Sequence, residues 1–304
     1  MFIQRKNLRS FCMPKIVVIL FHIYFLLMNL SIANAGEIKS AHWFLKSPRT
    51  PLKIQTNYLQ TLPSGTFLFY VGYEFQQNWV APIYQYTGNL HRIGVLRLAY
   101  YLAKTVRLQL SGGIHQVLDY EKTPDNSELS DNSHCAADVG DFSIATIAQL
   151  VSGTKYWPAL GLRIDTKLPN TNQSKGIGTN TTDITITLLS TYRYGTWSIF
   201  SDIGVGILSA PLKVNLQNDV LVYGAGFFWQ LSHRLQLAGE VNGYHSTINK
   251  IPIGTEDRGK IRLGVVWKFP MFAVEVYPSY GLTRYEGNWG ISAGISLMGS
   301  LLNH

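Results

Sequence analysis

The feature that most constrains the fold is an alternation of apolar and polar residues, repeated along most of the chain. One clear example, residues 259–269, sets Ile261, Leu263, Val265, Trp267 and Phe269 against Lys260, Arg262, Gly264, Val266 and Lys268. Successive side chains of a β-strand point to opposite faces, so this period predicts a strand with one apolar and one charged face. The charged face cannot pack into the core of a soluble sandwich, because unpaired buried charges are too costly.

Twelve segments with this alternation follow one another from residue 65 onward. They are residues 65–75, 91–102, 105–116, 140–152, 156–167, 181–193, 196–208, 219–231, 234–245, 259–269, 271–281 and 288–298. Most of the segments are 11 to 13 residues long. Strands of soluble proteins usually have roughly 5 or 6 residues, whereas a tilted strand needs roughly 9 to 11 to cross a bilayer. The lengths therefore favour a membrane protein over a soluble periplasmic β-protein.

The connections between these segments alternate between short and long. Tight turns are expected at 103–104, 153–155, 195, 232–233 and 270, and long polar connections at 76–90, 117–139, 168–180, 209–218, 246–258 and 282–287. Outer-membrane barrels have an even number of antiparallel strands, short periplasmic turns and longer extracellular loops. Only a closed sheet gives every strand backbone group a partner in hydrocarbon. We therefore predict an all-β fold for residues 64–304, a transmembrane antiparallel β-barrel of about 12 strands with both termini periplasmic.

Aromatic residues gather near the ends of the predicted strands, where a barrel meets the two membrane interfaces. The candidates for this girdle are Phe67, Phe75, Tyr194, Trp197, Trp229, Trp267, Phe269, Phe272 and Trp289. Only 14% of the residues are charged, against roughly 25% in soluble domains. Both observations agree with an apolar, lipid-facing outer surface.

The first 35 residues indicate export. Arg5, Lys6, Arg9 and Lys15 precede an almost uninterrupted apolar stretch at 16–32, and Ala33-Asn34-Ala35 follows it. A basic leader, an apolar run and a small-x-small site predict a signal peptide, cleaved before Gly36. An uncleaved membrane anchor is the alternative, although His22 and Asn29 make the run less suitable for spanning a bilayer. Either alternative takes the remainder out of the cytoplasm, and the barrel pattern predicts the bacterial outer membrane.

Several linked motifs in the middle of the chain resemble one family of outer-membrane barrels. The motifs are Val139-Gly140-Asp141-Phe142-Ser143, Pro158-Ala159-Leu160, Lys167-Leu168-Pro169, Gly176-Ile177-Gly178-Thr179 with Asp183, Leu231-Ser232-His233-Arg234-Leu235 with Glu240, and Trp289-Gly290 with Gly294. Together they resemble the uncharacterised barrels named after the meta-pathway of phenol degradation, over residues 65–298. The resemblance implies an outer-membrane transport protein without an established substrate. The chain departs from the usual terminal aromatic residue of such barrels, because Met298-Gly299-Ser300-Leu301-Leu302-Asn303-His304 ends it.

The polar faces of the predicted strands place charged side chains inside the barrel. The predicted lumen-lining residues are Glu74, Arg97, Arg107, Asp141, Arg163, Asp165, Lys167, Asp183, Arg193, Asp202, Arg234, Glu240, Arg262, Lys268 and Glu275. The basic and acidic groups are nearly balanced in number. Two interpretations remain open: ion pairs that bridge a narrow barrel, or opposed charges along an aqueous path.

Motifs for chemistry are weak, and we expect no catalytic residue, no metal and no cofactor. Gly290-Ile291-Ser292-Ala293-Gly294 matches a nucleophile elbow, but the motif lies within a strand rather than at a strand-to-helix turn. Asp131, His134, Cys135 and Asp138 contain metal-binding residue types without paired Cys or His spacing. Gly176-Ile177-Gly178 lacks the third glycine of a dinucleotide site.

We therefore expect a barrel that lets small solutes cross, with polar and small hydrophobic or aromatic compounds both open as solutes. An outer-membrane hydrolase, or a closed structural or surface-binding barrel, is the alternative. Expected partners are outer-membrane lipid and lipopolysaccharide, the machinery that assembles barrels, and a small-molecule solute. Nucleic acid is not expected, since no Lys/Arg cluster is interleaved with aromatic residues. Residues 36–63 are a periplasmic leader or a plug inside the barrel, with the leader preferred.

Overall fold

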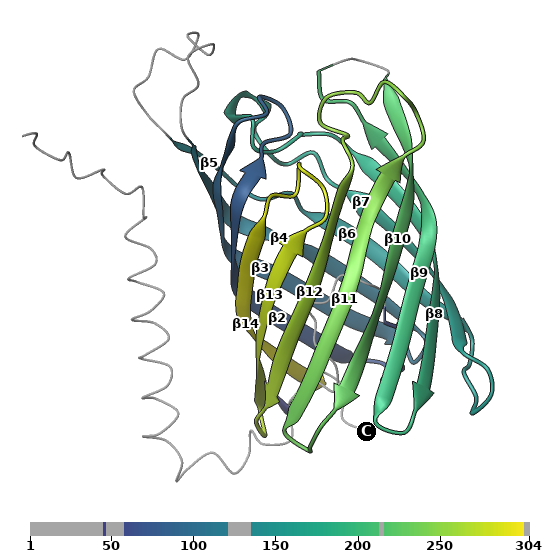
Figure 1. Ribbon diagram of the computed structural model, residues 1–304. Coiled ribbons are helices and arrows are strands. Elements are labelled where there is room, and N and C mark those ends of the chain that lie inside the picture. The colour runs from purple at the N-terminus through teal and green to yellow at the C-terminus, as the bar shows by residue number, and fades with distance from the viewer. Residues whose placement is uncertain (1–44, 47–57, 121–134, 213–215, 301–304) are drawn as a thin grey trace, which may run out of the picture. The chain divides into compact units, whose positions relative to one another are not determined.

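Twelve long antiparallel strands form a closed sheet, in which the last strand pairs with the first of the ring (Figure 1). The structure is a computed structural model, and it describes residues 45–46, 58–120, 135–212 and 216–300. The strands of the ring are β2 (Thr66–Val80), β3 (Thr87–Ala103), β4 (Val106–Tyr120), β6 (Ser143–Val151), β7 (Ala159–Lys167), β8 (Asp183–Tyr194), β9 (Trp197–Ser209), β10 (Gln217–Gln230), β11 (Leu235–Ser246), β12 (Arg258–Lys268), β13 (Phe272–Gly281) and β14 (Trp289–Ser300). The predicted β-barrel is confirmed.

Three short elements accompany the ring. Strand β1 (Leu45–Lys46) pairs with the end of β14, and β5 (Cys135–Asp138) pairs with the upper part of β4. The 3-10 helix η1 (Gln173–Lys175) is the one helix among the described residues. None of the helical structure that the described residues contain is long and apolar enough to cross a membrane.

The strands follow the predicted segments closely. One difference is at the end of β2, where polar residues interrupt the alternation. Strand β2 runs on to Val80 through Gln76-Gln77-Asn78, which the sequence places in a loop. Asn78 takes a left-handed conformation with φ of 54°, and the pairing with β3 shifts register there. The bulge lets the strand continue although the alternation of side chains is broken.

Short and long connections lie at opposite ends of the barrel, as Figure 1 shows. The connections after β3, β6, β8, β10 and β12 form one end, which we call the turn end; four of them have two to four residues and the one after β6 has seven. The other connections, of six or more residues, form the loop end. An even number of antiparallel strands brings the start of β2 and the end of β14 to the same end, the turn end. This geometry follows from the strand count alone.

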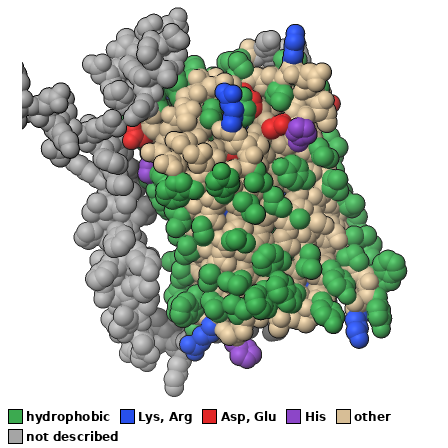
Figure 2. Space-filling view, viewed as in Figure 1, with side chains coloured by type: hydrophobic (Ala, Val, Ile, Leu, Met, Phe, Trp, Pro, Cys, Tyr) green, Lys and Arg blue, Asp and Glu red, His purple; other side chains and the backbone are tan. Residues whose placement is uncertain are grey.

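The outer face of the barrel is apolar and its inner face is polar. Ile199, Ile203 and Val205 of β9 are more than half exposed on the outer face, whereas Phe200 and Asp202 between them are buried. Figure 2 shows hydrophobic side chains over the body of the barrel and charged side chains near its two ends. This distribution suits a surface surrounded by hydrocarbon, where exposed charges are costly.

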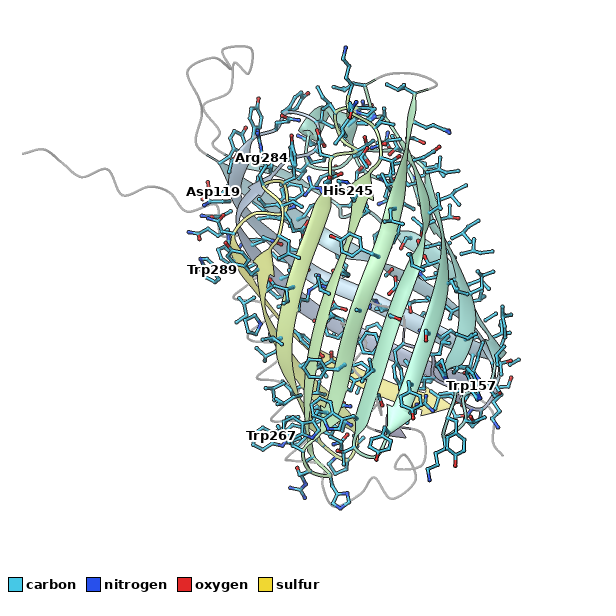
Figure 3. All side chains as sticks on the ribbon, turned by 45° about the vertical axis from the view of Figure 1, so that its right-hand side comes forward. Asp119, Trp157, His245, Trp267, Arg284 and Trp289 are labelled. Atoms are coloured by element: carbon cyan, nitrogen blue, oxygen red, sulfur yellow. The ribbon has the colours of Figure 1, made fainter. Side chains whose placement is uncertain are left out.

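Aromatic side chains lie near both ends of the wall. Trp157 and Trp267 lie toward the turn end and Trp289 toward the loop end (Figure 3). Trp197 stacks on Trp229 with ring centroids 4.8 Å apart. Tyr and Trp prefer the membrane interface because their rings are apolar and their N–H or O–H groups are polar. The positions match the two girdles of a membrane barrel.

Strand β13 carries an irregularity of its own. Tyr277 lies flat against Gly264 of β12, where a Cβ atom would lie only 1.9 Å from the Tyr277 Cδ1 atom. The next residue is Pro278, and the pairing of β12 with β13 is interrupted between Arg262 and Val265. Proline has no N–H to donate to a neighbouring strand. The Tyr277 ring on Gly264 thus packs the wall where the pairing of β12 with β13 is interrupted.

A charge on the outer face should destabilise the barrel in a bilayer. Ile203→Arg places a guanidinium at the middle of β9, where Ile203 is 56% exposed. We expect unfolding in lipid vesicles to become about 2–4 kcal/mol easier, as measured by urea titration. Thr196→Arg in the β8–β9 turn is the matched control and should change stability by less than about 0.5 kcal/mol. Equal effects of the two substitutions would contradict a lipid-facing β9.

Candidate functional site: a charged cavity inside the barrel

A cavity of about 530 Å³ occupies the loop-end half of the barrel interior. Its wall contains equal numbers of basic and acidic side chains. The basic residues are Arg92, Arg97, Arg163, Lys167, Arg258 and Lys260, and the acidic residues are Glu74, Asp141, Asp165, Asp183, Asp202 and Glu286. Apolar and aromatic residues such as Trp79, Val95, Leu208 and Tyr244 complete the lining. The cavity is therefore polar, close to neutral, and partly aromatic.

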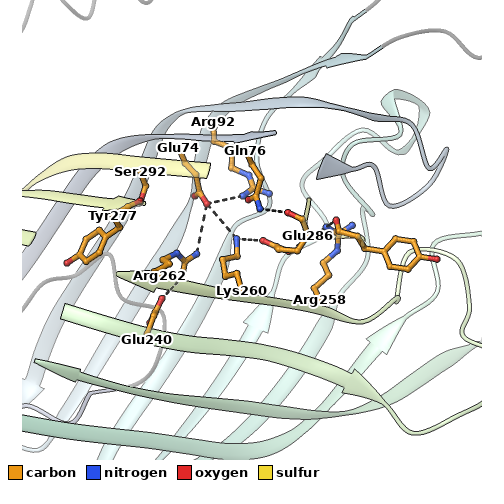
Figure 4. A network of polar contacts seen from close by, with 11 residues as sticks. Glu74, Gln76, Arg92, Glu240, Arg258, Lys260, Arg262, Tyr277, Glu286 and Ser292 are labelled. Carbon is orange, nitrogen blue, oxygen red and sulfur yellow. Dashed lines mark hydrogen bonds and ion pairs between the residues drawn. The ribbon is translucent and has the colours of Figure 1, made fainter. Parts of the chain in front are cut away.

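One ion-pair network crosses the cavity between β2, β3 and β12 (Figure 4). Glu74 Oε1 lies 3.7 Å from Arg92 Nη1, 3.6 Å from Lys260 Nζ and 4.0 Å from Arg262 Nη2. Glu74 and Arg92 are opposite each other in the register of β2 and β3. One carboxylate thus joins cations from two strands that are far apart in the sequence, which fixes the charges in place.

Two neighbours continue this network toward both ends of the barrel. Toward the turn end, fully buried Arg262 donates to Glu240 Oε1, its register partner on β11. Toward the loop end, Lys260 contacts Glu286 of the β13–β14 connection. Buried charges persist only when they are paired and hydrogen-bonded, and each member here has a partner of opposite sign.

A second network lies on the opposite wall, on β7 and β8. Lys167 pairs with its register partner Asp183 and donates to Thr181 Oγ1 at 3.2 Å. Arg163 donates to Asp165, two residues further along the same face of β7. Asp183 also accepts a bond from the backbone N–H of Ser209 at 2.9 Å, which ties β8 to the end of β9.

Residues 58–62, before the first strand of the ring, cross the barrel interior on the turn-end side of the cavity. The Tyr58 ring packs edge-on against Phe200 and Phe228, with centroids 5.8 and 5.1 Å away. Arg193 Nε donates to the Tyr58 hydroxyl at 2.7 Å, and Arg107 Nη2 donates to the Tyr58 carbonyl at 3.2 Å. These contacts come from β4, β8, β9 and β10, so the segment lies among opposite walls of the ring.

Two further side chains hold the same segment. Leu59 packs with buried Ala145, Ile147, Ala159 and Leu189, and Leu62 packs with Leu68, Tyr70, Ala99 and Tyr101. Leu59 N–H donates to Thr191 Oγ1 at 3.1 Å. The interior is narrowed here by chain that precedes the barrel. The remaining residues of the predicted leader or plug, apart from 45–46 and 63, lie outside the described residues.

Loop-end connections bond to one another across the mouth of the cavity. Gln85 Nε2 donates to Glu256 Oε1 at 2.7 Å, and Ile83 N–H donates to the Gly176 carbonyl at 3.4 Å. Pro82, Gly254 and Glu286, each from a different connection, line the cavity itself. The cavity is thus bordered by loops at the loop end, whereas residues 58–62 lie further toward the turn end and are not part of its lining.

The structure distributes the predicted lumen residues over three levels. Glu74, Arg97, Asp141, Arg163, Asp165, Lys167, Asp183 and Asp202 line the cavity. Glu240, Arg262 and Glu275 are buried inside the ring, where Ser296 donates to Glu275. Arg107 and Arg193 hold residues 58–59, and Lys268 donates to Gln230 Oε1 at 2.8 Å. The placement of Arg234 was wrong: it is exposed in the β10–β11 turn, because β11 begins one residue later.

Four charged residues of the cavity wall are absent from the predicted set: Arg92, Arg258, Lys260 and Glu286. Lys260 alternates with Arg262, so the period of two already indicates it. The alternation does not predict that Arg92 faces inward. Gly94, with φ of 65°, is an extra residue in β3 relative to β2, and it reverses which positions of the strand face inward. Arg258 and Glu286 fall in or beside connections, where side chains follow no period.

The motifs for chemistry do not assemble into a site. Ser292 lies within β14, is buried, and donates to the Tyr277 carbonyl at 3.4 Å. Among the described residues no three His, Cys, Asp or Glu side chains come close enough to hold a metal ion. Asp131 and His134 of the candidate metal group lie outside the described residues.

Comparison with solved structures supports the architecture. An outer membrane channel from Pseudomonas putida F1, solved by crystallography, is similar with a TM-score of 0.56 and 16% identity, over 81% of this chain and 99% of that chain. The fold is that of an outer-membrane β-barrel.

Other solved barrels give lower values. The NanC porin gives a TM-score of 0.47 at 6% identity, over 78% of this chain and 100% of that chain. The CymD monoaromatic hydrocarbon channel gives 0.41 at 10% identity, over 80% and 90%. No protein-family model matches the sequence, and no curated protein matches it.

Replacing one member of the Arg262–Glu240 pair should destabilise the barrel more than replacing both members. Arg262→Met leaves the Glu240 carboxylate buried without its guanidinium, at a cost of about 3–5 kcal/mol. The double variant Arg262→Met with Glu240→Leu should regain most of that loss, because the buried carboxylate is removed together with its guanidinium. Urea unfolding of the protein in vesicles measures both. Additive losses in the double variant would show that the two side chains do not depend on each other.

Proposed function

We propose that this protein is an outer-membrane channel for small solutes. The observation that carries the proposal is a closed barrel with an apolar outside around a polar cavity of about 530 Å³. An apolar outer face is what a bilayer requires, and a polar interior is what a water-soluble compound requires on its way across. Passive diffusion through such an interior needs no chemical step.

The proposal includes a location, the outer membrane, and a family. The barrel shares its fold with a protein described as an outer membrane channel. Outer-membrane barrels keep short turns on the periplasmic side, which would place the turn end and both termini there. The motifs from Val139 to Asp183 support membership of the family named after the meta-pathway of phenol degradation.

The lining of the cavity favours small solutes that carry polar groups, aromatic ones included. Paired cations and carboxylates can offer hydrogen bonds to a passing solute, and a nearly neutral wall does not exclude either sign of charge. Trp79, Tyr223 and Tyr244 add aromatic surface beside the charges. A pure hydrocarbon would have to displace water from ionised groups without replacing its hydrogen bonds.

Single-channel recording is the direct test. Protein purified from the outer membrane of an expression host is inserted into a planar lipid bilayer with salt on both sides. We expect discrete, reproducible current steps. Silence from protein that is demonstrably folded and inserted would contradict an open channel. Liposome swelling with matched polar and aromatic solutes would then rank the solute classes.

Charge removal inside the cavity should change ion preference. Lys167→Gln removes a cation that lines the cavity and leaves Asp183 without its register partner. We expect the reversal potential in a salt gradient to shift toward cation selectivity. Lys104→Gln removes the same charge from an exposed turn residue and should leave the reversal potential unchanged. If both variants match the wild type, solutes do not pass along β7 and β8.

A closed barrel is the second candidate, because residues 58–62 narrow the interior. Tyr58→Ala removes the ring from Phe200 and Phe228 and the hydroxyl from Arg193. If the segment limits passage, the conductance of this variant should rise above that of the wild type. Thr61→Ala lies in the same segment and serves as the control. An unchanged conductance in Tyr58→Ala would mean that the segment does not limit the flow.

A further inference from the structure

The connection between β13 and β14, residues 282–288, turns one side chain into the barrel. Glu286 is only 4% exposed and lines the cavity, whereas Arg284, two residues earlier, is exposed. Little apolar surface holds the connection, because Leu282 is half exposed. The connection is therefore held against the barrel mainly by polar contacts.

Two cations of β12 hold the Glu286 carboxylate, one on each oxygen. Lys260 Nζ contacts Oε1, and Arg258 Nη1 lies 3.7 Å from Oε2 (Figure 4). Lys260 also faces Glu74 at 3.6 Å, so the contact continues the network across the cavity. The mouth of the cavity and its interior thus share the same charges.

Arg258 joins the connection to the end of β2. Its guanidinium donates to the Tyr285 carbonyl and to the Val80 carbonyl, both at 2.8 Å, and lies 4.8 Å from the centre of the Trp79 ring. Gln76 donates to the Glu286 carbonyl. The end of β2, the start of β12 and the β13–β14 connection therefore meet at one guanidinium and one carboxylate.

The Glu286 carboxyl is held in its ionised form. Burial alone would raise its pKa, but Lys260 and Arg258 outweigh the burial and keep the pKa below the ordinary value for glutamate. At neutral pH the carboxylate is charged, so its contact with Lys260 is a charge-assisted hydrogen bond, which is stronger than a neutral one, and its contact with Arg258 is an ion pair.

We propose that Glu286 holds the β13–β14 connection over the mouth of the cavity and sets both the opening and the ion preference of the channel there. The proposal rests on the proposed channel function. Loss of the carboxylate would remove the contacts with Lys260 and Arg258 and so loosen the connection, although the backbone bond from Leu282 N–H to the Gly259 carbonyl and the bond from Arg258 to the Tyr285 carbonyl remain. It would also leave Lys260 and Arg258 with less compensating charge. The mouth would then be wider and more attractive to anions.

Limited proteolysis tests the attachment without any current. Trypsin cleaves after Arg284, which is exposed but belongs to the connection that Glu286 holds. In Glu286→Gln, cleavage of the folded protein at this bond should be roughly tenfold faster, the factor expected from one lost charge-assisted hydrogen bond in a local opening. Arg284→Gln abolishes this fragment and so identifies it. Heat-modifiable migration in a gel verifies that both proteins are folded. Equal cleavage rates in the folded wild type and the folded Glu286→Gln variant would overturn the proposal.

Single-channel recording tests the consequence for transport. Glu286→Gln should conduct more than the wild type and shift its reversal potential toward anions. Arg284→Gln changes the charge of the same connection outside the cavity and should shift neither. Faster cleavage with unchanged currents would mean that Glu286 fixes the connection but does not control passage, which also overturns the proposal. A silent wild type contradicts the channel function itself, and the cleavage rates then still decide whether Glu286 holds the connection.

Discussion

The pairing of β14 with β2 closes the sheet, and the other features of the barrel depend on this closure. Eleven consecutive residue pairs, from Gly290–Gln76 to Ser300–Thr66, join the last strand to the first strand of the ring. In hydrocarbon an open edge would leave a row of backbone groups without partners. Closure also divides the side chains into two sets, because alternate positions of every strand now face either the surroundings or an enclosed interior. The apolar outer face and the charged cavity are two results of one hydrogen-bond pattern.

Strand register then decides which charges meet. Glu74 with Arg92, Lys167 with Asp183, and Glu240 with Arg262 are direct cross-strand partners in the ladder. Opposite charges at such positions stabilise the pairing of their strands, and a shift by one residue would turn all of them toward the outer face. The same side chains that make the cavity polar therefore also specify how the strands align. A substitution at one of these positions would therefore change both the strand pairing and the cavity wall.

The fold can be predicted from the sequence because the two-residue period of a strand is a local property of the chain. The alternation around Arg163 and Arg262 predicts both their strands and their inward orientation, without any knowledge of the partners. The same rule misses Arg92, since Gly94 adds a residue that no alternation announces. It also misses Glu286, because a connection has no period and its side-chain directions come from long-range contacts such as Lys260. Residues 58–62 show the same limit: their apolar residues find opposite walls that exist only after closure.

The buried ion pairs of the interior have a consequence for the medium in which such a protein works. At moderate salt, mobile ions largely screen the attraction between exposed charges more than about 10 Å apart, but they screen enclosed pairs much less. Arg262 and Glu240 are almost fully enclosed and are not part of the cavity lining, unlike Lys260 and Glu74. The Arg262–Glu240 pair should therefore hold β11 against β12 equally well in dilute and in concentrated salt.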